Sequence, residues 1–330
     1  MIRSDLPISV IIPTRNGAKR IPSCVEALVA ALAPQDEIVI VNDASTDETA
    51  FVASRFPCRV INLTENIGAA RARNVGAKHA KHEILFFTDD DVLVKPDTLA
   101  KLRNHYHNPE ISGVVGILDS DIPFTNHASN VKNLWMRFTY LKCPKEKVGL
   151  FYTSIASIRK TVFQEVGGFD ENYAGASLLE DTEFGQRVWQ KGYHIRIDTA
   201  LSVTHVKHYT WTSILKTDYD RARALTHMKL RKWGQDFYTS VPISFQLAIP
   251  VLLMSIAFLV LSLVTGLPFL WSSLPVFIFF ALTFTWLQFL FQSRGIVFGL
   301  VGTLFHFIDS FVVGMGMISA CLRHLAGKTY

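Results

Sequence analysis

The sequence predicts an α/β fold with a doubly wound, mainly parallel sheet, followed by an all-α transmembrane region of about three helices. Strand-like apolar runs alternate with helical segments along residues 8–91, which is typical of strands joined by crossover helices. Polar clusters follow the ends of three of these runs. Farther on, residues 241–322 carry only two charged side chains, Arg294 and Asp309, so we expect this region to lie in lipid.

The individual elements follow from the spacing of apolar residues. Continuous apolar runs bounded by turn residues indicate buried strands, and apolar residues three to four apart indicate helices. The expected strands cover residues 8–13, 37–43, 58–63 and 83–91. The expected helices cover residues 21–32, 49–56, 68–80 and 182–192.

Three polar clusters fall where expected strands end: Pro13–Asn16, Asn42–Asp43 and Asp89–Asp91. The carboxyl ends of parallel strands meet at one edge of a sheet, and ligands of such folds bind there. We therefore expect the three clusters to line one crevice.

The change of composition near residue 241 predicts two domains. Residues 1–240 mix charged, apolar and turn residues as a soluble domain does, and residues 241–330 form the membrane domain. The expected spans lie near residues 243–264, 267–291 and 296–322. No apolar signal segment precedes the first strand, so we expect a multi-pass protein of the inner or plasma membrane with a cytoplasmic first domain.

The distribution of charge favours a membrane partner over nucleic acid. The formal charge is +5, but the basic residues gather mainly in residues 221–232, directly before the apolar region, where anionic lipid headgroups explain them better. With three spans, Arg294 lies inside as the positive-inside tendency prefers, whereas Arg323 and Lys328 lie outside, against it. Four scattered cysteines indicate neither a disulfide framework nor a zinc site.

The acidic triplet at the end of the fourth strand is a candidate metal site. On an extended backbone Asp89 and Asp91 face one side and Asp90 the other. Two carboxylates at that spacing can share Mg²⁺ or Mn²⁺, which fill their remaining positions with water and phosphate oxygens. The alternative is a solvated acidic turn, but the place at a strand's carboxyl end favours the metal site.

Six segments occur in the order seen in family 2 glycosyltransferases: SVIIPTRN, EIVIVNDASTDET, NIGAARARNVGAKHA, ILFFTDDDV, VGGFDE and LLEDTEFGQRVWQKGY. The chain therefore resembles this family. The resemblance implies a GT-A fold, an inverting mechanism and a nucleotide-sugar donor, with a UDP-sugar favoured. The Q-x-x-R-W motif of processive members is absent, which makes polymer synthesis less favoured.

The resemblance assigns residues to the donor site. A loop after the first strand contacts the nucleotide, and Asp43 resembles the carboxylate that binds the base, with capping of the next turn as the alternative. A glycine and two arginines match the segment that approaches the nucleotide or an active-site carboxylate, with a salt bridge as the alternative. The expected donor-binding residues are Pro13, Thr14, Asn16, Asp43, Gly68, Arg71, Arg73, Asp89 and Asp90, and the expected metal ligands are Asp91, Asp89 and His205.

The resemblance also assigns the catalytic and acceptor residues. Glu180 and Asp181 match the acidic pair of the family, and Asp181 is implied to be the general base that takes a proton from the acceptor hydroxyl. Stabilisation of the following helix by acidic residues in its first turn is the alternative. Gly168, Phe169 and Asp170 resemble the turn on the acceptor side.

The expected acceptor is a hydroxyl of a membrane lipid or lipid-linked glycan, and other functions remain open. A polyprenyl-phosphate sugar transferase would need no general base because its acceptor is already ionised. A non-catalytic membrane scaffold could bind nucleotide-sugars. In the last apolar segment, His306 and Asp309 share a helix face, where they either stabilise the bundle or meet a lipid headgroup.

Overall fold

The computed structural model describes residues 6–172, 179–231, 236–266 and 268–327. The chain forms two compact units, and each is described by itself. The first comprises residues 1–123 and 143–207, and the second comprises residues 124–142 and 208–330. The functional boundary expected near residue 241 stays a prediction, because compactness alone does not say where a membrane begins.

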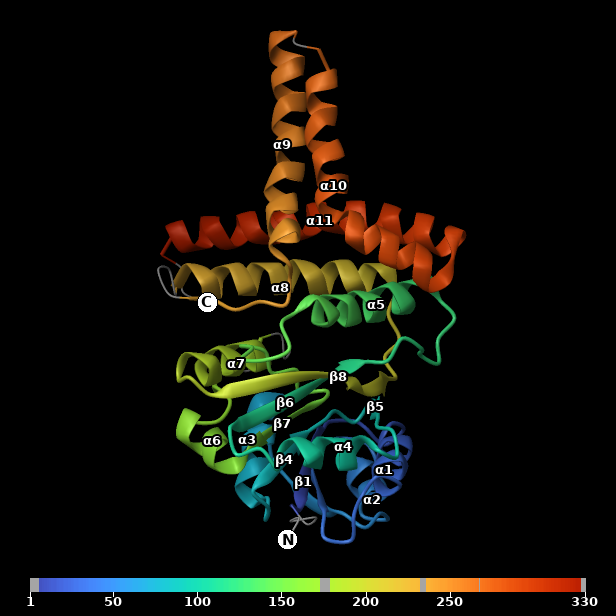
Figure 1. Ribbon diagram of the computed structural model, residues 1–330, viewed down its shortest axis with the longest axis vertical. Helices are drawn as coiled ribbons and strands as arrows, with labels where there is room; N and C mark the ends of the chain where they lie inside the picture. Colours follow the sequence, from blue (N-terminus) through green and yellow to red (C-terminus); the bar gives the residue numbers. More distant parts are fainter. Residues whose placement is uncertain (1–5, 173–178, 232–235, 267, 328–330) are drawn as a thin grey trace. The chain divides into compact units, whose positions relative to one another are not determined.

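The first unit is built on an eight-stranded sheet, with strand order β3-β2-β1-β4-β7-β6-β8-β5 (Figure 1). Its strands are β1 (Ile8–Thr14), β2 (Glu37–Asn42), β3 (Arg59–Asn62), β4 (Ile84–Phe87), β5 (Val92–Leu93), β6 (Ile111–Leu118), β7 (Ala156–Arg159) and β8 (His194–His205). Neighbours among β1 to β4 are parallel, as are β6 and β8, while β7 and β5 run antiparallel to their neighbours. The predicted mainly parallel sheet is confirmed.

The described part of the first unit contains α1 (Ile21–Val29), α2 (Thr49–Ala53), α3 (Ala69–His79), α4 (Thr98–His105), α6 (Lys160–Val166) and α7 (Glu180–Gln190). α1, α2, α3 and α7 lie close to the four expected helices, whereas α4 and α6 were not expected. α3 packs against β1 and β2 at Gly76, where a Cβ atom would lie 2.5 Å from Cγ2 of Ile11. This close approach packs the second half of α3 against the middle of β1.

The register of the sheet aligns the polar strand ends. Thr14 pairs with Asn42, and Asn42 pairs with Asn62. The β4 strand lies on the other side of β1, with Phe87 opposite Ile11. The loops after β1, β2 and β4 therefore leave the sheet at the same edge, as the polar clusters predicted.

An aromatic cluster fixes the segments around this edge. Phe87 of β4 lies 5.3 Å from Phe169 and 5.4 Å from Phe163, measured between ring centroids. Phe169 lies 4.8 Å from Phe184 of α7, and all four rings are buried. Burial of large apolar rings stabilises a fold strongly, so this cluster anchors α6, α7 and the turn between them to the sheet.

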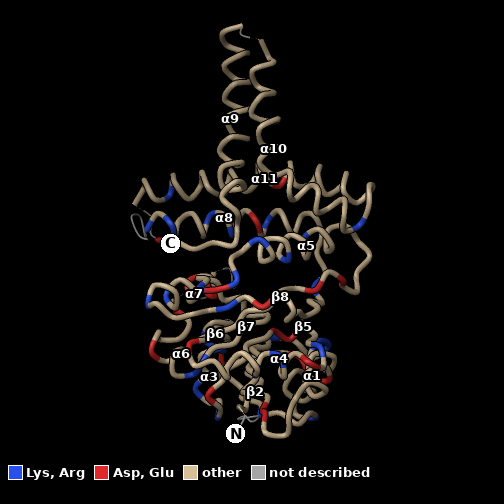
Figure 2. Tube along the Cα trace, viewed as in Figure 1, with Lys and Arg blue, Asp and Glu red and all other residues tan. Residues whose placement is uncertain are grey.

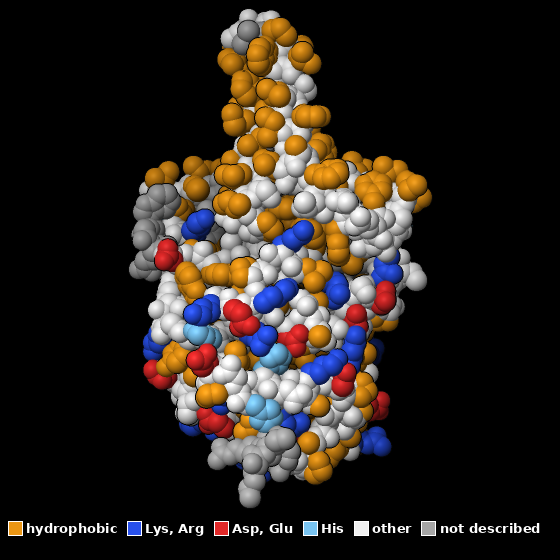
Figure 3. All heavy atoms as spheres, in the orientation of Figure 1, with side chains coloured by type: hydrophobic (Ala, Val, Ile, Leu, Met, Phe, Trp, Pro, Cys, Tyr) orange, Lys and Arg blue, Asp and Glu red, His pale blue; other side chains and the backbone are white. Residues whose placement is uncertain are grey.

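The second unit is helical. It contains α5 (His127–Lys142), α8 (Trp211–Arg231), α9 (Ile243–Thr265), α10 (Leu270–Arg294) and α11 (Ile296–Leu325). The last three are each long and apolar enough to cross a membrane, with mean hydropathies of 2.8, 2.0 and 2.0. They match the three expected apolar helices. Charged side chains are almost absent from α9 and α10 (Figure 2), and apolar side chains cover the surface of that pair (Figure 3).

Candidate active site

Arg73 of α3 joins the end of β4 to the start of α7. Its Nη2 donates to Oδ1 of Asp89 at 2.7 Å, and its Nη1 donates to Oε1 of Glu180 at 2.9 Å. The side chains of Arg73 and Glu180 are 4% and 3% exposed, so this ion pair is weakly screened by water. The bridge brings the acidic triplet and the acidic pair, which are ninety residues apart in the sequence, to one place.

The carboxylate of Asp89 stays charged because its partners outweigh its burial. Burial alone would raise its pKa, but the guanidinium of Arg73 and the hydroxyl of Ser154, which donates to Oδ2 at 2.7 Å, hold the pKa of Asp89 below its usual value. Ser154 was not identified from the sequence, since it lies outside every motif. Its only signal is its position two residues before β7, the strand that pairs with β4.

Asp90 holds the first loop in place. Its carboxylate accepts two hydrogen bonds from Arg20, at 2.8 and 2.9 Å, and one from Oγ1 of Thr14 at 2.5 Å. Asp90 therefore ties the end of β1 and the start of α1 to the acidic turn. Arg20 was also missed in the sequence, where it reads only as a residue flanking a helix.

Asp91 and His205 form the pair that best fits a metal ion. Oδ1 of Asp91 lies 3.2 Å from Nε2 of His205, and the side chains are 19% and 12% exposed. Residues 90 and 91 form a turn instead of the extended backbone we expected, so Asp89 turns to Arg73 while Asp91 turns to His205. The expectation that Asp89 and Asp91 face one side of a strand is wrong.

The set of side chains that could bind a metal ion is small, but it suits a hard cation such as Mg²⁺ or Mn²⁺. Among the described residues, no group of three or more His, Cys, Asp or Glu side chains is placed to hold a metal. Asp91 and His205 could supply two ligands. Mg²⁺ and Mn²⁺ sites that also bind phosphate commonly use few protein ligands and complete their coordination with phosphate oxygens and water. The pair therefore fits an ion that arrives with a diphosphate.

The loops after β1 and β2 are fixed by backbone hydrogen bonds to their polar side chains. Oδ1 of Asn16 accepts from the backbone N of Thr46 at 2.8 Å. The two carboxylate oxygens of Asp43 accept from the backbone N of Ile67 and Gly68, at 2.8 and 2.9 Å. Gly68 has φ +84°, a conformation that favours glycine. Asp43 thus positions the loop that begins α3, and its expected contact with a base stays a prediction.

The glycine turn after α6 is held against α3 by Asn74. Nδ2 of Asn74 donates to the backbone O of Phe169 at 2.9 Å, and Oδ1 accepts from the backbone N of the same residue at 2.9 Å. Gly168 has φ +67° and lies against Asn74, so a side chain there would be strained and crowded. Phe169 points into the aromatic cluster, whereas Asp170 accepts from the backbone N of Asn172.

Asp181 lies in the first turn of α7 and is partly exposed, in contrast to the buried Glu180. The backbone N of Thr182 donates to Oδ1 of Asp181 at 2.6 Å, and the hydroxyl of Thr182 donates to the same atom at 3.2 Å. These contacts orient the carboxylate.

Three further residues of the expected donor site lie at the end of β1 and on α3. Pro13 and Thr14 end β1, beside the acidic turn. Arg71, on the exposed side of α3, donates from Nε to the backbone O of Glu171 at 3.2 Å. Arg71 therefore helps to hold the turn after α6 and, unlike Arg73, remains 42% exposed.

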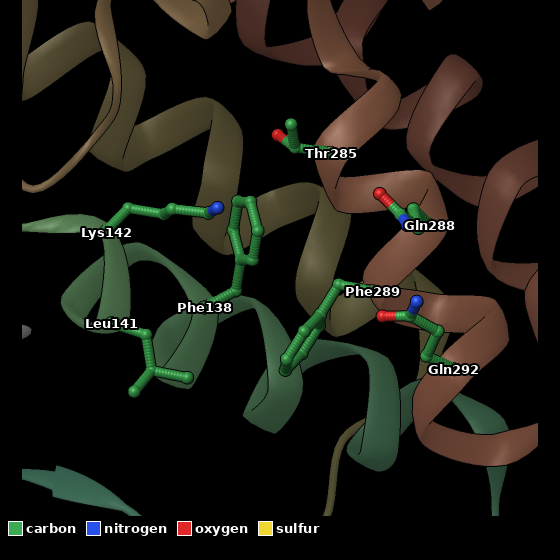
Figure 4. A pocket seen from close by; sticks show the side chains of 7 residues that line it. All are labelled: Phe138, Leu141, Lys142, Thr285, Gln288, Phe289 and Gln292. Atoms are coloured by element: carbon green, nitrogen blue, oxygen red, sulfur yellow. The ribbon is translucent and has the colours of Figure 1, made fainter.

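The second unit contains a separate cavity of about 260 Å³ between α5 and α10. Three polar side chains of α10 line it at helical spacing, Thr285, Gln288 and Gln292, together with the cation Lys142 of α5 (Figure 4). Its apolar walls are Phe138, Leu141 and Phe289. Cavities with apolar walls and a few polar groups suit amphipathic ligands.

Two family models match the chain. Residues 9–167 match the model for glycosyl transferase family 2, and residues 136–210 match the model for the N-terminal domain of galactosyltransferase. These matches cover the strands, loops and α7 that build the candidate active site.

Relatives and a solved structure agree with these matches. O-antigen chain rhamnosyltransferase RfbN of Salmonella typhimurium is 27% identical over 216 residues, covering 62% of this chain and 68% of the relative. An uncharacterized glycosyltransferase of Haemophilus influenzae is also 27% identical, covering 64% and 71%. Mannosyltransferase PcManGT from Pyrobaculum calidifontis, solved with GDP-Man and Mn²⁺, has a TM-score of 0.59 and 20% identity, covering 97% of this chain and 87% of that chain. This likeness shows a GT-A-like fold.

Proposed function

Because residues 9–167 match the model for glycosyl transferase family 2, we propose that the first unit transfers a sugar, with inversion, from a nucleotide-sugar to a hydroxyl acceptor. A UDP-sugar is the favoured donor. The observation that carries the proposal is the Arg73 bridge, which holds Asp89 and Glu180 within hydrogen-bonding distance of one guanidinium. A donor-side turn and an acceptor-side helix start are thereby held together, as a transfer between two substrates requires.

Asp181 is the general base in this proposal. As the acceptor oxygen bonds to the anomeric carbon, its proton passes to the Asp181 carboxylate and the bond from that carbon to the nucleotide diphosphate breaks. A single displacement from the opposite side inverts the anomeric configuration. Thr182 orients the carboxylate, and Glu180 acts as a positioning residue through Arg73.

Asp91 and His205 are the proposed ligands of Mg²⁺ or Mn²⁺. The bound ion would supply positive charge to the diphosphate of the donor. Asp89 has a different part in this proposal. It keeps Arg73 charged and in place, so that the acidic turn after β4 and α7 stay aligned around the donor. Asn16, Asp43 and Gly68 shape the nucleotide side of the same crevice.

The proposed acceptor is a membrane lipid or a lipid-linked glycan, met at the cytoplasmic face of the inner or plasma membrane. The names of two relatives, both O-antigen chain rhamnosyltransferases, support a glycan acceptor of this kind. The apolar helices α9 and α10 support a membrane location. The cavity beside Lys142 has the mixed lining that an anionic lipid headgroup would need.

The test compares Asp181→Asn with Asp97→Asn in the purified full chain, with hydroxyl and polyprenyl-phosphate acceptors assayed in parallel. We expect Asp181→Asn to lower kcat for the hydroxyl acceptor by about 10²–10⁴-fold while donor binding is kept, because a positioned base contributes roughly this factor. Asp97 pairs with Lys101 on the exposed surface of α4, and its substitution should leave kcat unchanged. Full transfer by Asp181→Asn to a hydroxyl acceptor would show that Asp181 is not the general base. Full transfer by the unmodified chain to polyprenyl phosphate, with none to a hydroxyl acceptor, would favour the alternative acceptor.

A further inference from the structure

The last apolar helix, α11, packs along α8 for most of its length. The rings of Trp211 and Phe305 lie 4.2 Å apart, and those of His227 and His324 lie 5.9 Å apart. From residue 211 to residue 227, α8 extends ~24 Å at ~1.5 Å per residue. The two helices therefore run side by side and in the same direction over this distance, as Figure 1 shows.

Close packing in the middle of this pair depends on Gly316. A Cβ atom at Gly316 would lie 2.5 Å from the backbone O of Tyr219 and 3.1 Å from Cβ of Ala222. Only glycine allows the two backbones to approach so closely. The contact between α8 and α11 is thus continuous from end to end and is not a single crossing point.

The partner helix α8 cannot enter the hydrocarbon core. Its charged residues are distributed along its whole length: Lys216, Asp218, Asp220, Arg221, Arg223, Lys229 and Arg231. Lys216, Lys229 and Arg231 are exposed. Charged side chains within a membrane are costly unless they face a bundle interior or a water-filled cavity. If α11 crossed the membrane, α8 would have to cross beside it.

The other side of α11 is apolar and exposed. Its exposed residues recur at helical spacing: Ile296, Leu300, Leu304, Ile308, Met315, Ile318, Leu322 and Leu325. Phe307 and Phe311 pack against the cluster formed by α9 and α10. Residues three and four apart share a helix face, so Leu304 and Met315 lie on the same side as these two rings. The exposed apolar face is therefore continuous with the apolar pair α9–α10.

We propose that α11 does not cross the membrane but lies along its surface, with this apolar face in the outer part of one phospholipid leaflet. The charged helix α8 then lies beneath α11 at the headgroup level, and α9–α10 is the only part of the second unit that enters the bilayer deeply. Helices with one apolar face and one polar partner side bind membranes in this way. The proposed occupant of the exposed face is lipid, because the face continues onto a helix pair that is apolar all round.

This arrangement removes the conflict in the charge distribution. With three spans, Arg323 and Lys328 lie outside, against the positive-inside tendency. With α9–α10 as a pair that enters and returns, Arg294, Arg323 and Lys328 all lie on the side of residues 1–240. The end of α11 should therefore be on the same side of the membrane as the first unit.

The first experiment determines that side in sealed inverted and right-side-out vesicles. A cysteine-free version of the full chain receives one cysteine, either Glu65→Cys on an exposed loop of the first unit or Ala326→Cys at the end of α11. We expect a membrane-impermeant maleimide to label both variants from the same side. Labelling from opposite sides would overturn the proposal.

The second experiment measures depth and does not depend on labelling of the ends. A spin label is placed in turn at Leu300, Leu304, Ile318 and Leu322, with Leu259 of α9 as the deep reference. For a surface helix, we expect all four positions to show one shallow depth in the leaflet. Depths that deepen toward the middle of α11 would show a span, and absence of lipid contact at all four would show that a second copy or another protein covers the face. Both results would refute the proposal.

Discussion

The two units place their apolar side chains in opposite ways. In the described part of the first unit, large apolar residues that are exposed are limited to Val29 and Phe51. In the second unit, exposed large apolar residues recur throughout α9, α10 and α11. Burial of apolar side chains is favourable when the alternative is water, so this distribution suits a water-exposed first unit and the proposed contact of α9, α10 and α11 with lipid.

Both units contain buried polar groups, which they pair to different extents. In the first, Arg73 is paired with two carboxylates through Nη1 and Nη2, although its Nε has no hydrogen-bond partner among the described residues. In the second, Nε2 of His306 and Oδ1 of Asp309 are buried without a hydrogen-bond partner among the residues that the structure describes. These two atoms therefore do not bond to each other, although the sequence allowed that pair. His306 instead stacks on Phe279, with ring centroids 5.3 Å apart.

The sharpest test of the comparison is one substitution made in both units. Phe87→Ala removes a buried ring that contacts Phe163 and Phe169, and we expect it to lower the free energy of unfolding by about 3–5 kcal/mol. Phe277→Ala on α10 removes a ring that is 74% exposed, and its cost should be below about 0.5 kcal/mol. Amide hydrogen exchange of β4 and α10 in the full chain measures each unit separately. Equal losses of stability in Phe87→Ala and Phe277→Ala would contradict the difference between the two units.

The second prediction concerns the buried ion pairs. Arg73→Met leaves Glu180 and Asp89 without their shared cation, and we expect the first unit to lose about 3–5 kcal/mol of stability. The matched control is Arg196→Met, which breaks an exposed pair with Glu146 and should cost less than about 1 kcal/mol. Chemical unfolding of both variants provides the measurement. A loss in Arg73→Met no larger than in the control would show that the bridge contributes little.

The third prediction concerns nucleotide binding, which the proposed function assigns to the first unit. A nucleoside diphosphate with Mn²⁺ should stabilise the full chain by ~2.7 kcal/mol at a concentration of 100 Kd. UDP, GDP and CDP are compared by thermal unfolding, with and without a chelator. We expect Asp91→Asn and removal of the metal to abolish the stabilisation for the preferred nucleotide, while Lys142→Ala in the second unit keeps it. If the nucleotide and Mn²⁺ still stabilised Asp91→Asn, Asp91 would not be a metal ligand.

The smallest expected effect is on acid stability. Arg73 and Ser154 hold the pKa of Asp89 below its usual value despite burial, so the folded state binds this proton less readily than the unfolded chain. Its stabilising contribution is therefore complete above the unfolded pKa of ~3.9 and is lost as the pH falls through the lower folded pKa. Asp89→Asn should make stability less dependent on pH in this range. Glu110→Gln, at an exposed position, serves as the control. If the stability of Asp89→Asn fell more steeply with falling pH than that of the unmodified chain, the stated direction of the Asp89 pKa shift would be wrong.

Part of the site was readable from local patterns. The ends of β1 at Thr14 and of β2 at Asn42 lie within one residue of the expected ends, whereas β4 ends at Phe87 and not at the expected residue 91. The parallel register places these three ends at one edge. The pairing of Asp91 with His205 could also be predicted, because the resemblance assigned both residues to the metal site. The different directions of Asp89, Asp90 and Asp91 could not, because a turn after β4 replaces the extended backbone on which the expectation rested.

By itself, the sequence determined the α/β sheet, the carboxylates at its edge and the three apolar helices, since each depends on a periodicity or a run of neighbouring residues. Only the tertiary structure decided which side chains meet across long separations, such as Ser154 with Asp89, Arg20 with Asp90, and α8 with α11. Hydropathy measures whether a helix tolerates lipid, not what lies beside it. The charged neighbour of α11 is set by packing at Gly316, and no local pattern encodes that contact.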